Sequence, residues 1–198
     1  MIPQPAPLRR RASRQGFLPA GLLAAFLVLV AAAGPVCAAD SAPFREYDVK
    51  AVFLFNFAQF IDWPESALPE VSVPFVIGVL GADPFHEILD QTVQGERIHG
   101  RPVQVKRFRR LDDVDGCQLL FVSRSEAGRL ADIVRRLSGR GILTVSDLEP
   151  FGRMGGMITF KTTRDRVHFE INVAAAEKQG FKISSKLLKV AQVVSGEP

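Results

Sequence analysis

The sequence predicts an α/β fold, in which a mostly parallel central sheet is flanked by helices and followed by a C-terminal β-hairpin and two C-terminal helices. Three observations predict this class. Short apolar strands alternate with helix-like segments between residues 73 and 145. Two strand-like segments separated by a three-residue turn then follow, and two capped helix-like segments end the chain.

The first expected element is a helix from Tyr47 to Trp63, which Pro64 should end because proline disfavours helical backbone in the residue before it. Most of this helix is apolar, and its polar side chains fall on about one third of the circumference. Val52 and Phe55 interrupt that polar sector. One interpretation is a helix packed deep in the protein; the other is that Val52 and Phe55 reach the surface and complete an apolar patch for a partner.

The apolar run at residues 73–80 predicts a buried strand. Residues 81–84 predict a turn into a short helix, with Asp83 as its N-cap. Residues 102–108 alternate apolar and polar side chains imperfectly, which indicates a strand nearer an edge of the sheet.

The rest of the fold follows from the same signals of apolar runs, caps and helix-ending glycines. Ser123 or Ser125 should cap a helix that lies between the buried strands expected at 118–122 and 142–145. In chain order, the expected elements are strands at 118–122 and 142–145, hairpin strands at 157–162 and 166–171, and helices at 173–179 and 184–194.

The first 38 residues have the form of a cleaved export signal, because arginines precede the uncharged apolar run 17–33 and small residues lead to a cleavage position after Ala38. A retained membrane anchor is the alternative for this run. We expect residues 39–46 to form a flexible N-terminus, residues 47–194 a single α/β domain and residues 195–198 a C-terminal tail.

Charge and cysteine content restrict the partners of the exported chain. The sequence has 25 Lys and Arg against 21 Asp and Glu, and removal of the four arginines in the signal leaves 21 against 21. No basic excess remains to favour nucleic acid. Loss of Cys37 with the signal leaves Cys117 as the remaining cysteine, which excludes an intramolecular disulfide. Because Cys117 lies beside an apolar strand, we expect its thiol to be buried and inert.

Sequence patterns for catalysis are lacking. His86, His99 and His168 are far apart, and no Cys, His and carboxylate group has the spacing of metal ligands. The glycine-rich residues 152–156 lack the lysine of a phosphate-binding loop and precede a strand. We therefore expect no enzyme activity, no cofactor and no metal.

The carboxyl ends of the parallel strands offer a different kind of site, since open sheets of this class bind ligands there. These ends supply Asp83, Ser123, Ser125 and Asp147. They would line a crevice for a small ligand, or they would cap helices and form turns, which the same residue types do in most proteins.

Several blocks of sequence occur in a characteristic order. The first is Tyr-x-Val-Lys-Ala-x-Phe-Leu-x-Asn-Phe from Tyr47 to Phe57, followed by Trp63 and Pro64. The later blocks are Leu-Phe-Val-Ser at 120–123, Leu-Thr-Val-Ser-Asp at 143–147, Gly-Gly-Met-Ile at 155–158, Phe-Glu-Ile-Asn at 169–172 and Ile-Ser-Ser-Lys-Leu-Leu at 183–188. Together, from about Tyr47 to Val194, they resemble the YfiR family of periplasmic proteins.

The resemblance implies a periplasmic, non-enzymatic regulator that binds the sensor portion of an inner-membrane diguanylate cyclase and represses it, which lowers cyclic-di-GMP and biofilm formation. It also implies a homodimer. We expect the contact surface to include Val52, Phe55, Phe151 and Arg153. The alternative is a periplasmic sensor module that binds a small ligand in the crevice at the strand ends.

Overall fold

The computed structural model describes residues 44–164 and 166–194. The expected export signal, residues 1–38, and the expected C-terminal tail, residues 195–198, lie outside the described residues. Among the helices that the structure describes, none combines the length and the apolar character needed to cross a membrane.

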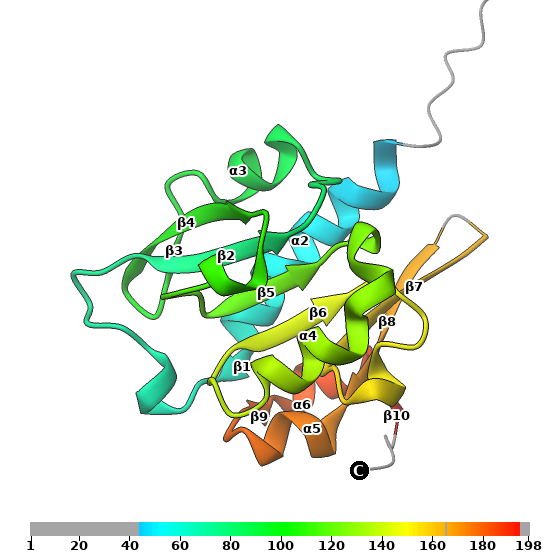
Figure 1. The fold of residues 1–198 in the computed structure, drawn as a ribbon. Coiled ribbons are helices and arrows are strands. Elements are labelled where there is room, and N and C mark those ends of the chain that lie inside the picture. Colours follow the sequence, from blue (N-terminus) through cyan, green and yellow to red (C-terminus); the bar gives the residue numbers. More distant parts are fainter. Residues whose placement is uncertain (1–43, 165, 195–198) are drawn as a thin grey trace, which may run out of the picture. The chain divides into compact units, whose positions relative to one another are not determined.

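The centre of the described unit is an eight-stranded sheet with the order β10-β8-β7-β6-β5-β2-β4-β3 (Figure 1). Its strands are β2 (Phe75–Leu80), β3 (Arg97–Ile98), β4 (Arg101–Phe108), β5 (Leu119–Val122), β6 (Leu143–Ser146), β7 (Ile158–Thr163), β8 (Arg166–Asn172) and β10 (Gln192–Val194). Neighbours pair in parallel except in the hairpins β3-β4 and β7-β8. The predicted fold class is confirmed.

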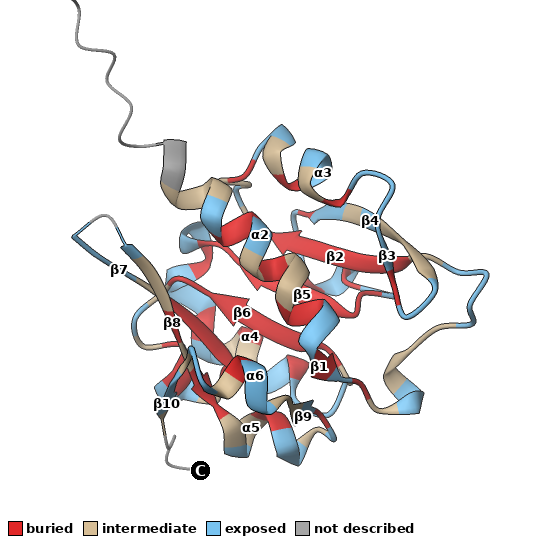
Figure 2. Cartoon of the chain, turned by 180° about the vertical axis from the view of Figure 1, so that it is seen from behind, coloured by how far each residue is buried: buried red, intermediate tan, exposed pale blue. Residues whose placement is uncertain are grey.

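Helices cover both faces of this sheet. α2 (Phe44–Phe60) and α3 (Glu87–Val93) lie on one face, and α4 (Leu130–Leu137) lies on the other (Figures 1 and 2). Short helices α5 (Val173–Lys178) and α6 (Ser185–Leu188) follow the hairpin, and 3₁₀ turns occur at Glu65–Ala67, Leu111–Asp113, Arg124–Arg129 and Gly152–Met154. Because helices cover both faces, every residue of β2, β5 and β6 is buried.

Two apolar clusters form the core, one on each side of the sheet. The cluster under α2 is rich in aromatic rings, and the centroid of the Phe57 ring lies 4.8 Å from that of Phe169 and 5.6 Å from that of Phe160. The cluster under α4 contains Phe108 and Phe151. The sheet therefore separates side chains of the α2 face from those of the α4 face.

The first helix ends earlier than the sequence predicts. α2 stops at Phe60, and Ile61–Asp62 form the short strand β1, which pairs antiparallel with β9 (Lys182–Ile183). The Trp63 side chain donates a hydrogen bond from Nε1 to the Ala58 carbonyl oxygen at 3.0 Å. Tertiary strand pairing thus ends the helix before the proline does.

The prediction of a helix through residues 184–194 is wrong beyond its first turn. α6 covers only Ser185–Leu188, and Gln192–Val194 form β10, an edge strand parallel to β8. Consecutive β-branched residues, Val193 and Val194, favour a strand over a helix. Pairing with β8 supplies the backbone hydrogen bonds that a helix would otherwise make.

The position of Asp83 also differs from the prediction. α3 begins at Glu87, and its N-cap position, His86, makes no side-chain cap. Asp83 Oδ1 instead accepts a hydrogen bond from the Phe85 N–H at 2.8 Å, within the turn that precedes the helix. Asp83 therefore stabilises a turn and is not the N-cap of α3.

Candidate functional site

An exposed apolar strip runs along the outward face of α2. The exposed fractions of Val49, Val52 and Phe60 are 41%, 49% and 42%, and Asn56 lies among them at intermediate exposure. The positions are i, i+3, i+7 and i+11, which share one side of a helix. We call Val49, Val52, Asn56 and Phe60 the α2 strip; Figure 2 shows α2 on the outside of the sheet with exposed and intermediate stretches along it.

The buried side of α2 carries a lysine that is fully buried. Lys50 Nζ lies 2.7 Å from Asp147 Oδ2 and 2.5 Å from Glu46 Oε1. It also lies 4.4 Å from the centroid of the Tyr47 ring, a distance at which the ring face attracts a cation. A buried ammonium group requires partners of this kind, because an unpaired charge is costly to remove from water.

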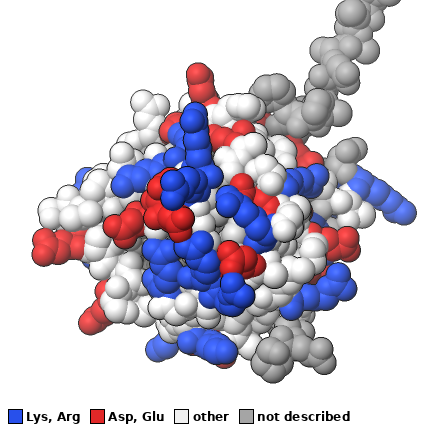
Figure 3. Space-filling view, in the orientation of Figure 1, with Lys and Arg blue, Asp and Glu red and all other residues white. Residues whose placement is uncertain are grey.

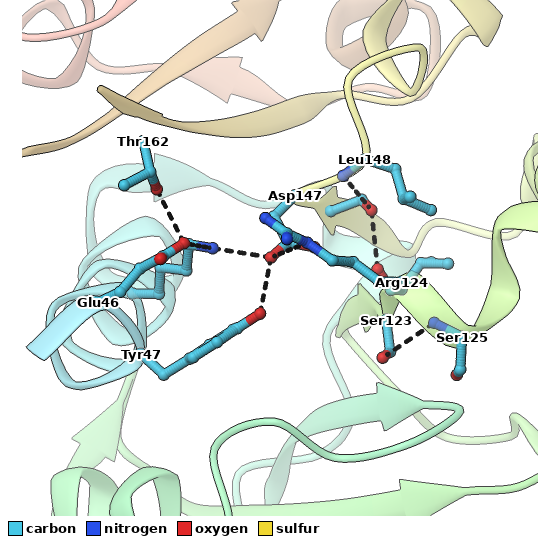
Figure 4. Close-up of polar contacts among 11 residues, drawn as sticks. Glu46, Tyr47, Ser123, Arg124, Ser125, Asp147, Leu148 and Thr162 are labelled. Carbon is cyan, nitrogen blue, oxygen red and sulfur yellow. Dashed lines mark hydrogen bonds and ion pairs between the residues drawn. The ribbon is translucent and has the colours of Figure 1, made fainter. Parts of the chain in front are cut away.

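Asp147 is the centre of this polar group, which we call the Asp147 cluster: Glu46, Tyr47, Lys50, Arg124 and Asp147. Tyr47 donates a hydrogen bond from its hydroxyl to Asp147 Oδ2 at 3.0 Å, and Arg124 Nε lies 3.1 Å from the same oxygen. Figure 4 shows Tyr47 and Arg124 both pointing towards Asp147. Two acidic side chains thus balance two basic ones.

The parallel sheet explains how distant segments meet here. Asp147 directly follows β6, and Arg124 begins the 3₁₀ turn after the neighbouring strand β5. Carboxyl ends of adjacent parallel strands lie at the same edge of a sheet. The first turns of α2 pass over that edge and supply the other three members of the cluster.

The cluster perturbs two of its own ionisable groups. Burial would raise the pKa of Glu46, but hydrogen bonds from Lys50 and Thr162 and the charge of Lys50 outweigh burial, so this pKa is lowered. Burial and the neighbouring Asp147 carboxylate raise the pKa of Tyr47 to about 12. Glu46 is therefore ionised and Tyr47 neutral near pH 7.

One oxygen of the cluster is left without a partner. Asp147 Oδ1 is buried and accepts no hydrogen bond from the described residues, whereas Oδ2 contacts three cluster members. Breaking a buried pair of this kind costs more than the pair itself contributes, because the remaining charge stays buried. The cluster therefore holds the start of α2 in one position over the sheet, with the α2 strip facing outwards.

The predicted crevice between the ends of β2 and β5 is filled by its own side chains. Ser125 Oγ accepts a hydrogen bond from the Ala82 N–H at 2.9 Å, and Ser123 Oγ accepts one from the Ser125 N–H at 3.5 Å. Gly81 lies so close to this turn that a Cβ there would come within 2.3 Å of Ser125 Oγ. Ser123 and Ser125 thus serve as caps and loop contacts.

The other two residues predicted to line that crevice lie in separate groups. Asp83 Oδ2 pairs with Arg107 Nε at 2.9 Å, and Arg107 also pairs with Asp90 on α3. Asp147 belongs to the cluster under α2. The structure therefore does not bring Asp83, Ser123, Ser125 and Asp147 together as one set of ligand contacts.

The residues predicted to contact a partner are also divided. Val52 is in the α2 strip, and Phe55 flanks it, half-buried against the core. Phe151 is fully buried in the cluster on the α4 side, with its ring against Gly156, so it has no surface to offer a partner. Arg153 is exposed in the turn beside Phe151, on the α4 side of the sheet.

The face that carries α4 shows Lys and Arg interspersed with Asp and Glu (Figure 3). Several of these charges form ion pairs, including Arg136 with Asp112 and Arg135 with Asp132.

Within residues 44–164 and 166–194, no group of three His, Cys, Asp or Glu side chains is arranged to hold a metal ion.

Comparison with known families decides the relationship of this chain. The model of the YfiR/HmsC-like family matches residues 47–192. The chain belongs to the YfiR/HmsC-like family. Curated proteins give no match to it.

Two sequence blocks that carry the family resemblance meet in the Asp147 cluster. Tyr47 and Lys50 come from the first block, and Asp147 ends the block at residues 143–147. The roles of Lys50, Glu46 and Arg124 were not predicted from the sequence, and neither was the exposure of Val49 and Phe60. A lysine within the apolar part of a helix was the one available signal for the cluster.

Proposed function

We propose that this protein is a periplasmic, non-enzymatic repressor that binds the periplasmic sensor portion of an inner-membrane diguanylate cyclase, lowering cyclic-di-GMP and biofilm formation. Membership of the YfiR/HmsC-like family supports the class of partner. The observation that carries the proposal is the α2 strip, an exposed apolar surface on the helix built from the family's first sequence block. Apolar side chains gathered on one exposed side of a helix are a common feature of protein-binding sites.

The Asp147 cluster gives the α2 strip a fixed geometry. Lys50 points into the protein one residue after Val49 points out of it, so the ion pairs of Lys50 set the rotation of the helix. A surface that is already ordered loses less conformational entropy on binding. Repression then requires that the strip bind the inactive state of the cyclase more tightly than the active state.

Within this proposal the contact surface consists of the α2 strip and the adjoining edge of Phe55. Phe151 is left out because it is buried, and Arg153 because it lies on the α4 side. A partner that covers Val52 would remove its exposed side chain from water, and central apolar anchors of this kind carry much of the energy of an interface.

The test is repression by Val52→Glu, with Met154→Glu as the matched control. Both wild-type side chains are apolar and similarly exposed, but Met154 lies in the turn with Arg153. Cyclic-di-GMP is measured in a strain without the gene that expresses each variant, and circular dichroism of the purified proteins checks folding. We expect Met154→Glu to repress and Val52→Glu to fail while remaining folded. Equal repression by both variants would remove the α2 strip from the proposal.

One observation favours the alternative of a small-ligand sensor, namely the unpartnered Asp147 Oδ1. A ligand with a hydrogen-bond donor would satisfy this oxygen if it entered beside Arg124, whose side chain is exposed. A saturable thermal shift with a periplasmic metabolite, lost in Asp147→Asn, would support this function. A shift that Asp147→Asn retains would place the ligand elsewhere.

A further inference from the structure

The strand β4 presents part of its backbone at an open edge of the sheet. β3 pairs with β4 only at Arg101 and Pro102, and the rest of β4 has β2 as its neighbour on the other side. Figure 1 shows β3 and β4 at one end of the strand order, with α3 nearby. An unpaired strand edge is a template for another strand.

The direction of each backbone group follows from two hydrogen bonds. Phe108 C=O accepts from Gly81 N–H at 2.9 Å and so points to the β2 side, whereas Val103 N–H donates to Glu96 C=O at 3.2 Å and points outwards. Successive residues of a strand alternate in this direction. Val105 and Arg107 therefore turn their N–H and C=O groups outwards, where the described residues supply no hydrogen-bond partner.

A groove of about 550 Å³ lies beside this edge, between β4 and α3. Val103 and Val105 are half-buried in it, and one face of α3 lines the opposite wall with Glu87, Asp90, Gln91 and Gln94. These four positions have the spacing i, i+3, i+4 and i+7, so they share a side of the helix. An extended peptide on the strand edge would place alternate side chains over this groove.

The groove has an acidic and amide lining. Glu87 and Asp90 are exposed, and Asp90 is paired with Arg107, whose guanidinium group reaches from β4 to α3. Among the described residues, Glu87 forms no ion pair and is the remaining carboxylate of the wall. A lysine or arginine in the peptide could lay its aliphatic stem over Val105 and bring its charge to Glu87.

We infer that the β4 edge and the α3 groove bind an extended segment of a partner protein, which adds as a strand to the sheet and places a basic side chain over the groove. Main-chain hydrogen bonds to Val105 and Arg107 provide the affinity, and the groove selects the side chain, as in other cases of strand addition. This surface is separate from the α2 strip, and the inference does not depend on the proposed cyclase partnership.

The probe is a phage-displayed library of random heptapeptides, selected on the exported form of the full protein. We expect enriched peptides that alternate β-branched and basic residues. A capped synthetic copy of the strongest peptide should bind in fluorescence anisotropy, and a copy with methylated backbone nitrogens should bind at least about tenfold more weakly, because it lacks the N–H donors that pair with the edge.

Two variants of one residue test the edge in the protein. Val105→Pro removes an N–H that makes no bond to β2, and proline is tolerated at strand edges, whereas Val105→Thr keeps the N–H and the strand preference. We expect Val105→Pro to weaken the peptide at least about tenfold and Val105→Thr to retain it. Glu87→Lys should weaken the basic peptides selectively.

Three results would overturn the inference. The first is a library that yields no peptide sensitive to Val105→Pro. The second is full retention of affinity by the backbone-methylated peptide. This measurement uses the wild-type protein, so it tests the inference even if Val105→Pro does not fold. The third is a wild-type dimer in sedimentation that Val105→Pro converts to a monomer, since a second copy of the chain would then cover this edge.

Discussion

Lys50 and Asp147 form a fully buried ion pair of 2.7 Å that joins the first helix to the end of β6. The two residues are 97 positions apart in the chain, and a fold is required to bring them together. Because the α2 strip lies on the outward side of the same helix, this pair links the packing of the core to the position of the proposed contact surface. Its removal should therefore affect stability first and repression as a consequence.

Lys50→Met should lower the free energy of unfolding by about 3–5 kcal/mol, because it leaves Asp147 and Glu46 without the cation between them. Urea denaturation followed by circular dichroism measures this change. The double variant Lys50→Met/Asp147→Leu should recover a large part of the loss, since an apolar pair of similar volume no longer buries a carboxylate whose remaining ionic partner, Arg124, is largely exposed. A single variant as stable as the wild type would show that the pair is not formed.

Tyr47 provides a direct probe of the cluster, because it is the one tyrosine of the chain. Its pKa is raised from 10.0 to about 12 by burial and by Asp147. The raised pKa contributes stability that is fully present below pH 10.0 and is lost as the pH rises towards about 12, since the unfolded chain ionises first. Ultraviolet titration of the folded protein should show no phenolate near pH 10.0, and Asp147→Asn should lower the titration midpoint.

The thiol of Cys117 should not react in the folded protein. It is buried, and burial raises its pKa to about 12. Titration with a thiol-reactive dye should label it only after denaturation, and electrophoresis without reductant should show no disulfide-linked dimer. Rapid labelling under native conditions would contradict the buried position.

The sequence predicted the parallel sheet because its strands are buried on both faces and therefore read as continuous apolar runs. The position of β4 near an edge followed from the imperfect alternation of its apolar and polar side chains. The capping role of Ser123 followed from its place after β5. The helical spacing of the polar sector offered the exposure of Val52 as one of two interpretations, the other being a helix packed deep in the protein. In each case the information lay within one segment of chain.

Features that depend on distant segments were not accessible in this way. The β-branched Val193 and Val194 are too short a signal to predict β10, because the strand that it pairs with, β8, comes 20 or more residues earlier. Lys50 gave no indication of its partners, since Asp147 is equally suited to a cap or a turn. Phe151 was expected at the surface because a glycine-rich loop is usually exposed, but the close approach of Gly156 allows its ring into the core.

The most direct test of repression from the periplasm is the level of cyclic-di-GMP in a strain that lacks the gene. The strain is complemented either with the full chain or with a version without residues 1–38. We expect a rise on deletion that the full chain reverses and the version without residues 1–38 does not. No rise on deletion, or equal reversal by both versions, would contradict a repressor that acts outside the inner membrane.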